Sequence, residues 1–371
     1  MFKEFICKQK RTIKLFSISA VISIVASLLI IGGGFVLAFS RTIRPPEVPS
    51  IPTSIVWDDD PFAQNTPTEN SNPSDSENDD PPEDELLEPH IPPPQLQQYE
   101  DRKPMFFTFL IIGLNNGLNA NTIMVGAYDY NTQQGYIISI PRDSRVDFER
   151  NNRKIVAAYQ VGRLGGRGHE GGISRMGMEV RSLIGFTPDF YISVDYDAFI
   201  RMVDAIGGVE IYVPFHMRYD DPLDNLRINI PAGLQTLDGL NALHFARYRT
   251  GNNPQFTITD FQRIEHQQQV LGAVMRELLT PASLLRIPEF IDIFSTYVNS
   301  DLSYGELVWL ANQGRAISGD SLHLYTLPMA GTCREFWYEF PDQAGILELV
   351  NRTVNPLVRD ITSADLRIVR N

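Results

Sequence analysis

Cysteine is scarce in this chain of 371 residues, which contains only Cys7 and Cys333. Two residues provide neither a disulfide framework nor the thiolate ligands of a structural zinc site. An uncharged hydrophobic run also separates them in the sequence, so we expect them on opposite sides of a membrane, where they cannot pair. The sequence therefore argues against a redox protein and against a zinc protein.

Common catalytic signatures are missing as well. His169-Glu170 is not accompanied by the second histidine of a zinc protease motif, and Ser144 lies outside any Gly-x-Ser-x-Gly sequence. The glycine-rich run 163–172 lacks the Gly-Lys-Ser/Thr ending of a nucleotide-binding loop. We expect this run to be a mobile basic loop, and we expect no metalloprotease, serine hydrolase or P-loop chemistry.

Charge is absent from residues 15–40, which are almost entirely apolar. A helix of about 20 apolar residues spans a bilayer, so this run is long enough with some tilt. Residues 1–14 carry five basic side chains and one acid, which predicts a cytoplasmic tail at 1–14, a transmembrane helix at 15–40 and an exported remainder. The alternative is a cleaved signal peptide, which fits less well because the run is long and has no clean cleavage site.

Lysine and arginine are absent from residues 45–101, which contain 15 acidic residues and many prolines. Proline removes backbone donors and like charges repel one another, so residues 41–103 are predicted to form a disordered, extended linker. Most of the chain's net charge of −13 belongs to this linker, because residues 102–371 sum to only −4. The rest has no basic stripe interleaved with aromatic residues, so no nucleic acid partner is expected.

Residues 104–371 have the pattern of one folded α/β domain. Short apolar runs rich in β-forming residues alternate with amphipathic segments, which predicts a central mixed sheet flanked by helices. Strands are expected at 106–113, 122–128, 136–140, 190–194, 209–213 and 323–327. Helices are expected at 174–185, 197–206, 260–279, 288–298 and 304–311, with a further one that Asp238 caps and that includes 242–246.

Arginines follow two of these elements. Arg142 comes directly after a buried strand, where α/β folds place ligand-binding groups, and its guanidinium matches phosphate oxygens with paired donors. Arg247 and Arg249 follow the helix around 242–246, while Arg263 and Gln267 lie one turn apart near the start of the next helix. These residues would suit a polyanion such as diphosphate. The alternatives are a surface turn for Arg142 and an ion-paired exposed face for the others.

Seven segments of the chain occur in the order and spacing of a known family. They are FLIIGLN, NTIMV, ISIPRDSRV, KIVAAYQVG, VDYDAFIRMVDAIGGVEIYVP, LDGLNALHFARYR and DFQRIEHQQQVL. Together they cover residues 105–279 and resemble the LytR–CpsA–Psr family, also called the cell envelope-related transcriptional attenuator domain. A short tail, one transmembrane helix and an extracytoplasmic domain are also typical of this family.

This resemblance implies a phosphotransferase of the bacterial cell membrane. Its substrate would be a glycopolymer on a polyprenyl diphosphate, such as a teichoic acid or a capsule, and its acceptor would be peptidoglycan. The family's fold has an apolar tunnel for the prenyl chain with arginines at its mouth. The implied catalytic residues are Arg142, Arg247, Arg249 and Arg263, and the implied substrate-binding residues are Asp143, Lys154 and Gln267.

The chain departs from the family at its metal site. Members usually have aspartates that hold Mg²⁺ at two positions, and these positions are Asn115 and Asn121 here. An amide oxygen can bind Mg²⁺, but it brings no negative charge and accepts no proton at neutral pH. The chain also has Val156 where the family has an asparagine, and His266 where it has an arginine.

Three functions therefore stay open at the level of the sequence. The first is a membrane-anchored glycopolymer transferase. The second is a catalytically weakened member that binds polyprenyl-linked glycans or organises cell-wall assembly. The third is transcriptional regulation, which a tail of about fourteen residues is too short to support through a DNA-binding domain.

Overall fold

The computed structural model describes residues 101–115, 119–221, 226–251, 256–278, 280, 287–314, 321–333 and 337–369. The predicted tail 1–14, the predicted transmembrane helix 15–40 and the linker up to residue 100 lie outside these residues. Within the described ranges, no helix has the length and apolar character that crossing a membrane requires.

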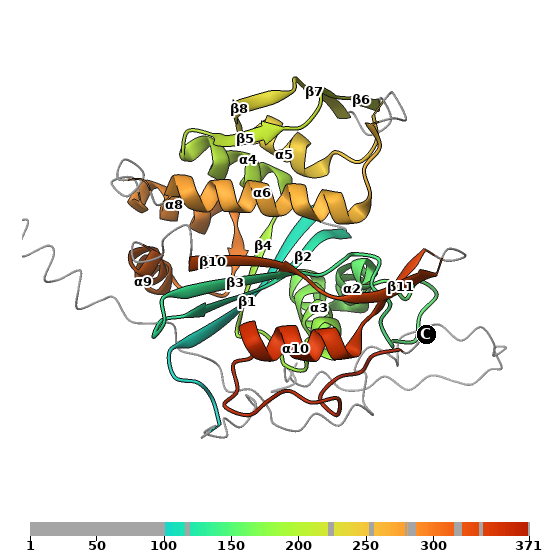
Figure 1. The fold of residues 1–371 in the computed structure, drawn as a ribbon. Helices are drawn as coiled ribbons and strands as arrows, with labels where there is room; N and C mark the ends of the chain where they lie inside the picture. Colours follow the sequence, from blue (N-terminus) through green and yellow to red (C-terminus); the bar gives the residue numbers. More distant parts are fainter. Residues whose placement is uncertain are drawn as a thin grey trace, which may run out of the picture.

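A six-stranded mixed sheet forms the centre of the structure (Figure 1). Strands β1 and β4 are parallel, as are β3 and β10, and β2 runs antiparallel to both β1 and β3. Consequently β1, β3, β4 and β10 end at the same edge of the sheet, here called the carboxyl edge. The strand order is β10 (Leu322–Thr326), β3 (Gln134–Ser139), β2 (Asn119–Asp129), β1 (Phe106–Asn115), β4 (Phe190–Val194) and β9 (Asn299–Ser300).

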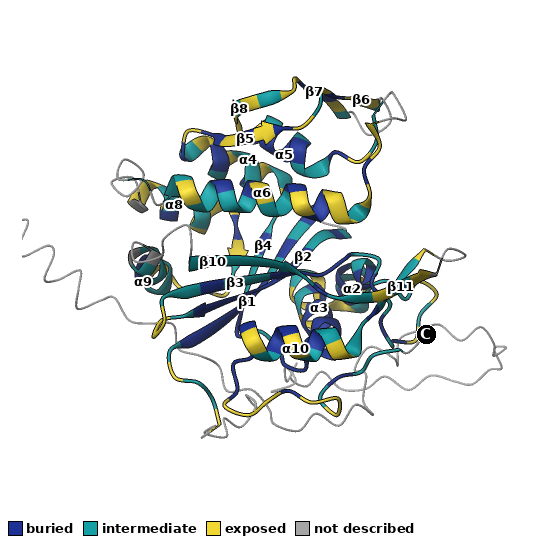
Figure 2. Cartoon of the chain, viewed as in Figure 1, coloured by how far each residue is buried: buried dark blue, intermediate teal, exposed yellow. Residues whose placement is uncertain are grey.

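Apolar side chains cover both faces of β1, which explains its nearly continuous hydrophobic sequence. Leu110 and Ile112 on one face join the core beneath α2 (Ala158–Gly162), α3 (Gly168–Ile184) and α10 (Gln343–Thr353). Phe107 on the other face packs against Trp309 of α9 (Tyr304–Gly314), with ring centroids 5.4 Å apart. The prediction of a mixed sheet flanked by helices is confirmed, and Figure 2 shows the buried strands between these helices.

A second core lies beyond the carboxyl edge of the sheet (Figure 1). Three helices and two small two-stranded sheets enclose it, and α8 (Ile287–Tyr297) packs beside them. The carboxylates of Asp195 and Asp238 cap the helices that begin at Tyr196 and Gly239, as expected for Asp238. The elements are α4 (Tyr196–Ala205), α5 (Gly239–Arg247), α6 (Asp260–Leu278), the antiparallel pair of β5 (Val209–Val213) with β8 (Gly233–Leu237), and the hairpin of β6 (Met217–Asp221) with β7 (Leu226–Ile230).

The prediction of a mobile loop at 163–172 is wrong. A π-helical turn covers Arg163–Arg167, and α3 begins at Gly168 rather than at residue 174. The glycines serve close packing of α2 on α3, because a Cβ on Gly162 would lie 2.1 Å from the carbonyl oxygen of Gly171. Glycine here indicates helix contact and not disorder.

Residues 101–103 belong to the folded part, although the linker was predicted to extend to residue 103. The backbone of Lys103 donates to the carbonyl of Pro356 at 2.9 Å, and Val358 donates to Asp101 at 2.7 Å. The Arg102 guanidinium pairs with buried Asp189. A third small sheet, β11 (Met329–Cys333) with β12 (Tyr338–Pro341), completes the described strands.

A buried ion cluster on α3 gives the first prediction. Glu179 is fully buried and accepts from Arg150 at 2.8 Å and from Arg175 at 2.8 Å. Glu179→Gln removes the charge that balances the buried guanidinium of Arg175 and the partly buried one of Arg150, so it should lower the free energy of unfolding by about 3 kcal/mol. Urea denaturation measures this loss. Glu170→Gln, at an exposed position of the same helix, should change it by less than about 0.5 kcal/mol.

Candidate functional site

The loop after β3 places Arg142 at the carboxyl edge of the sheet. Backbone hydrogen bonds hold this loop on both sides: Val156 donates to the Arg142 carbonyl at 3.1 Å, and Glu339 donates to the Asp143 carbonyl at 3.0 Å. Because the backbone is fixed at these points, the position of the Arg142 side chain is largely set before any ligand arrives.

Asp260, the first residue of α6, is the centre of an arginine cluster. One carboxylate oxygen accepts from Arg142 Nε at 3.2 Å. The other lies 3.5 Å from Arg249 Nε and 3.6 Å from an Arg263 guanidinium nitrogen. Three elements that are distant in the sequence therefore converge on one side chain. We call Arg142, Arg249, Asp260 and Arg263 the arginine cluster.

The cluster carries excess positive charge. Although burial favours the neutral acid, the charges of Arg263, Arg142 and Arg249 hold the pKa of Asp260 below its ordinary value. Burial, together with repulsion from Arg142 and Arg249, lowers the pKa of Arg263 to about 10, so this side chain is still charged at neutral pH. Three cations face one anion in the cluster, and the adjoining pair of Asp143 with Lys154 adds no net charge, so two positive charges are left for an anionic ligand.

Asp143 and Lys154 form an ion pair beside the cluster, at 3.1 Å. The two side chains come from the loop after β3 and from the residue before the short 3₁₀ helix Ile155–Ala157. Both are about one-fifth exposed, so a ligand can reach them from solvent.

The structure does not bring every predicted residue together. The Arg247 guanidinium lies over the Tyr196 ring, 4.4 Å from its centroid, and no ion pair within the described residues joins it to Asp260. Gln267 is half-buried on α6, and its side chain forms no hydrogen bond with another described residue. Asp260 was not predicted as a site residue, although its spacing three residues before Arg263 was a usable signal.

Asn115 and Asn121 lie at the same edge as Arg142. The pairing of β1 with β2 shifts between Gly113 and Leu114, which leaves Asn121 as the extra residue of a β-bulge. Ser139 pairs with Met124, so Asn121 and Arg142, each three residues further toward this edge, reach a similar level. Bulges often redirect a side chain beside an active site.

The described residues do not fit a magnesium site by themselves. No group of three or more His, Cys, Asp or Glu side chains with metal-binding geometry occurs among them. The carboxylates nearest in the site, Asp143 and Asp260, are paired with basic side chains, and two amides bring no charge to attract Mg²⁺. The arginines are therefore the groups in this site that can neutralise the charge of a phosphate ligand.

His266 faces the interior of the second core. It is buried, and its ring stacks on Phe245 with centroids 4.4 Å apart. Burial lowers its pKa to about 4, so it is neutral at pH 7 and does not replace the charge of the family's arginine at this position.

A pocket of about 240 Å³ lies between α3 and the strands β1 and β4, and Asp189 and Asp301 also line it. Leu110, Ile173, Met178 and Phe190 contribute its apolar lining. Phe190 begins β4, so this pocket is at the end of the sheet opposite to the arginine cluster.

Comparison with known proteins places these features in one family. The sequence profile of the LytR_cpsA_psr family matches residues 70–354. The chain therefore belongs to this family. The transferase TagV of Bacillus subtilis, named for transfer of teichoic acid from a polyisoprenyl carrier to peptidoglycan, is 26% identical over 269 residues, which are 68% of this chain and 65% of TagV.

Two further relatives are similar over shorter segments. The regulatory protein MsrR of Staphylococcus aureus is 27% identical over 49% of this chain and 51% of its own length. The cell wall biosynthesis protein LcpA of Corynebacterium glutamicum is 28% identical over 57% of this chain and 43% of its own length. The chain thus spans less than two thirds of each of these relatives.

The crystal structure of TagV has the same fold. It superposes with a TM-score of 0.56 and 22% identity, over 67% of this chain and 96% of that one. This likeness establishes the arrangement of sheet and helices.

His266 gives a pH-dependent prediction. Its pKa is about 4 in the folded protein and ordinarily 6.5. Between these values the unfolded chain binds more protons, so stability falls as the pH falls through this window. From pH 7 to pH 5 the free energy of unfolding should decrease by about 2 kcal/mol more in the wild type than in His266→Gln. Urea denaturation at both pH values tests this.

The matched control is Gln269→Ala, at an exposed position of the same helix with a side chain that does not titrate. This variant should keep the wild-type pH dependence. An unchanged slope in His266→Gln would contradict the assignment of a buried neutral imidazole.

Proposed function

We propose that the protein transfers a glycopolymer from a polyprenyl diphosphate to peptidoglycan. The observation that carries this proposal is the arginine cluster, whose two excess positive charges suit a diphosphate at the carboxyl edge of the sheet. Membership of the LytR_cpsA_psr family and similarity to a teichoic acid transferase support the same chemistry.

In the proposed reaction, a peptidoglycan hydroxyl attacks the phosphorus that bears the glycan. The bond from that phosphorus to the bridging oxygen breaks, polyprenyl phosphate leaves, and the departing phosphate takes up the proton of the hydroxyl. Arg142, Arg249 and Arg263 stabilise the charge on the phosphoryl oxygens during transfer. Asp260 is a poor proton acceptor because its pKa is lowered, so its part is to hold the three guanidinium groups in place.

The remaining partners follow from this proposal. Asp143 and Lys154 border the phosphate position, and Arg247 and Gln267 would meet more distant parts of the substrate. A transmembrane helix at 15–40 and a linker at 41–103 would keep the domain beside its lipid-linked substrate at the outer face of a bacterial cell membrane. The pocket of α3 with β1 and β4 is the proposed place for part of an apolar chain.

A second candidate is a member that binds polyprenyl-linked glycans without transferring them. The asparagines at positions 115 and 121 favour it, because two carboxylates that would anchor Mg²⁺ are replaced by neutral amides. In an active enzyme of this sequence, any Mg²⁺ would depend on the oxygens of the diphosphate itself.

Arg142→Ala tests the first candidate. We expect transfer to fall about 100-fold or more, because a preorganised cation is lost from the transferring phosphate. The full-length protein in detergent is mixed with Mg²⁺, a short polyprenyl-diphosphate glycan and a peptidoglycan oligomer, and mass spectrometry detects the phosphodiester. Arg218→Ala, at an exposed position on β6, should retain activity. Turnover within threefold of wild type in Arg142→Ala would refute the arginine cluster as the reaction site.

Asn115→Asp combined with Asn121→Asp separates the two candidates. Two carboxylates at the bulge should tighten Mg²⁺ binding by about tenfold or more, measured by isothermal titration calorimetry. If the protein is a transferase, the wild type, with both asparagines in place, already makes the phosphodiester product. Product that appears only in the double variant would establish a binding protein instead.

A further inference from the structure

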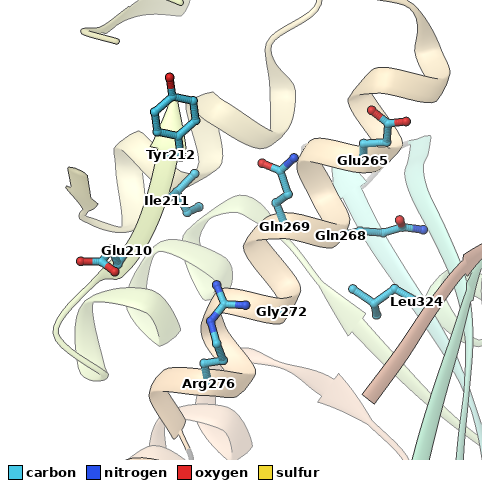
Figure 3. A pocket seen from close by; sticks show the side chains of 9 residues that line it. All are labelled: Glu210, Ile211, Tyr212, Glu265, Gln268, Gln269, Gly272, Arg276 and Leu324. Carbon is cyan, nitrogen blue, oxygen red and sulfur yellow. The ribbon is translucent and has the colours of Figure 1, made fainter. Parts of the chain in front are cut away.

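A groove of about 470 Å³ runs along α6 between β5 and β10 (Figure 3). It is separate from the side chains of the arginine cluster. Its lining residues are Glu210, Ile211, Tyr212, Glu265, Gln268, Gln269, Gly272, Arg276 and Leu324. In Figure 3, Gln269 and Arg276 lie on the side of α6 that is turned toward β5, Gln268 points toward Leu324 of β10, and the Glu210 carboxylate points away from α6.

Gly272 forms part of the floor of the groove. Glycine inside a helix costs about 1 kcal/mol relative to alanine, so its presence needs a reason. Packing of the fold does not supply one, because a Cβ at this position would meet only Arg276 at 3.6 Å and Leu324 at 3.8 Å, which are ordinary contact distances. The absence of a side chain at Gly272 keeps this part of the groove open.

The polar groups of the groove suit hydroxyl groups better than phosphates. Two carboxylates, Glu210 and Glu265, accept hydrogen bonds and repel anions, and one guanidinium, Arg276, donates. These three side chains are exposed and form no ion pair with one another or with other described residues. The charge of the groove is therefore opposite in sign to that of the arginine cluster.

An aromatic ring stands at the mouth of the groove. Tyr212 is 64% exposed, and its cross-strand neighbour on β8, Leu234, is 65% exposed. These two large side chains lie side by side on the two-stranded sheet of β5 and β8 and offer an apolar surface that a ligand can cover. A tyrosine ring offers an apolar face to the C–H face of a sugar, while its hydroxyl and the neighbouring carboxylate meet sugar hydroxyls.

The groove adjoins the reaction site along α6. Gln268 donates to Ser139 Oγ at 3.0 Å and to the Tyr325 carbonyl at 2.8 Å, which fixes this part of the helix to the carboxyl edge. Ser139 precedes Arg142 by three residues. Gln268 follows Asp260 by eight residues, which corresponds to about 12 Å of helix. A short oligosaccharide in the groove would thus end close to the arginine cluster.

We propose that this groove binds an uncharged saccharide segment of the glycan substrate. The statement that this saccharide is a substrate rests on the proposed function, whereas its binding can be measured without any transfer. The acidic side chains exclude the diphosphate from the groove, and the arginine cluster holds it. The two regions would divide one substrate into a neutral part and an anionic part.

The test uses the full-length protein in detergent and a tetramer of β-1,4-linked N-acetylglucosamine as the probe. Isothermal titration calorimetry should show saturable binding by the wild type. Gly272→Phe fills the groove and Tyr212→Ala removes the ring, so each should weaken binding about tenfold or more. Gly272→Ala should raise the thermal stability of the protein yet bind less tightly than the wild type, because helix propensity and groove volume change in opposite directions.

Folding and the proposed function are followed independently. Each variant is checked by circular dichroism and by its affinity for inorganic diphosphate, which groove variants should leave unchanged and which Arg142→Ala should weaken. If the wild type does not bind diphosphate, the result would count against the arginine cluster and not against the groove. Absence of saturable tetramer binding, equal binding by Gly272→Phe, or binding of a peptidoglycan stem peptide in place of the tetramer would overturn the saccharide groove.

Discussion

The contact of one carboxylate with three guanidinium groups governs the site. Without Asp260, the side chains of Arg142, Arg249 and Arg263 would repel one another at the edge of the sheet. With it, they are held close together and still carry more positive than negative charge. The rest of the structure serves this contact, because the sheet brings in one arginine and the helical layer brings in the carboxylate and the other two.

The charge of the side chains also changes along α6. Its first turn gathers arginines, and its later turns present a glutamate, amides and one arginine to a polar groove. A lipid-linked glycan has the corresponding order of chemical groups: an anionic diphosphate joined to neutral sugars. One helix with two differently charged stretches is therefore enough to orient such a molecule.

The sequence predicted the elements whose signals are local. The strands at 106–113 and 190–194 and the helix at 260–279 have strong apolar patterns, and their bounds agree with the structure within two residues at every end. The position of Arg142 after a buried strand followed from the same patterns. The hairpin of β6 with β7 and the strand β8 were not predicted, because each strand has only five residues and alternates between exposed and more buried side chains.

Long-range features were less accessible. The bulge at Asn121 depends on the register of two strands, and the stacking of Arg247 on Tyr196 depends on how α4 meets α5. In the sequence, Gly162 and Gly171 look like loop residues. Their actual role, close packing between two helices, is visible only in the folded structure. Such contacts arise from tertiary structure, so a single sequence carries little signal for them.

The presence of two separate cores has a mechanical consequence. Arg142 is attached to the core of the sheet, whereas Arg249 and Arg263 belong to the layer around α6, so the cluster straddles the junction. A dianion bound there would act as a clamp between two bodies, and its binding energy would be shared by both. Small rocking of one core on the other would change the spacing of the guanidinium groups, so the rigidity of the junction sets how well the cations converge on a phosphate.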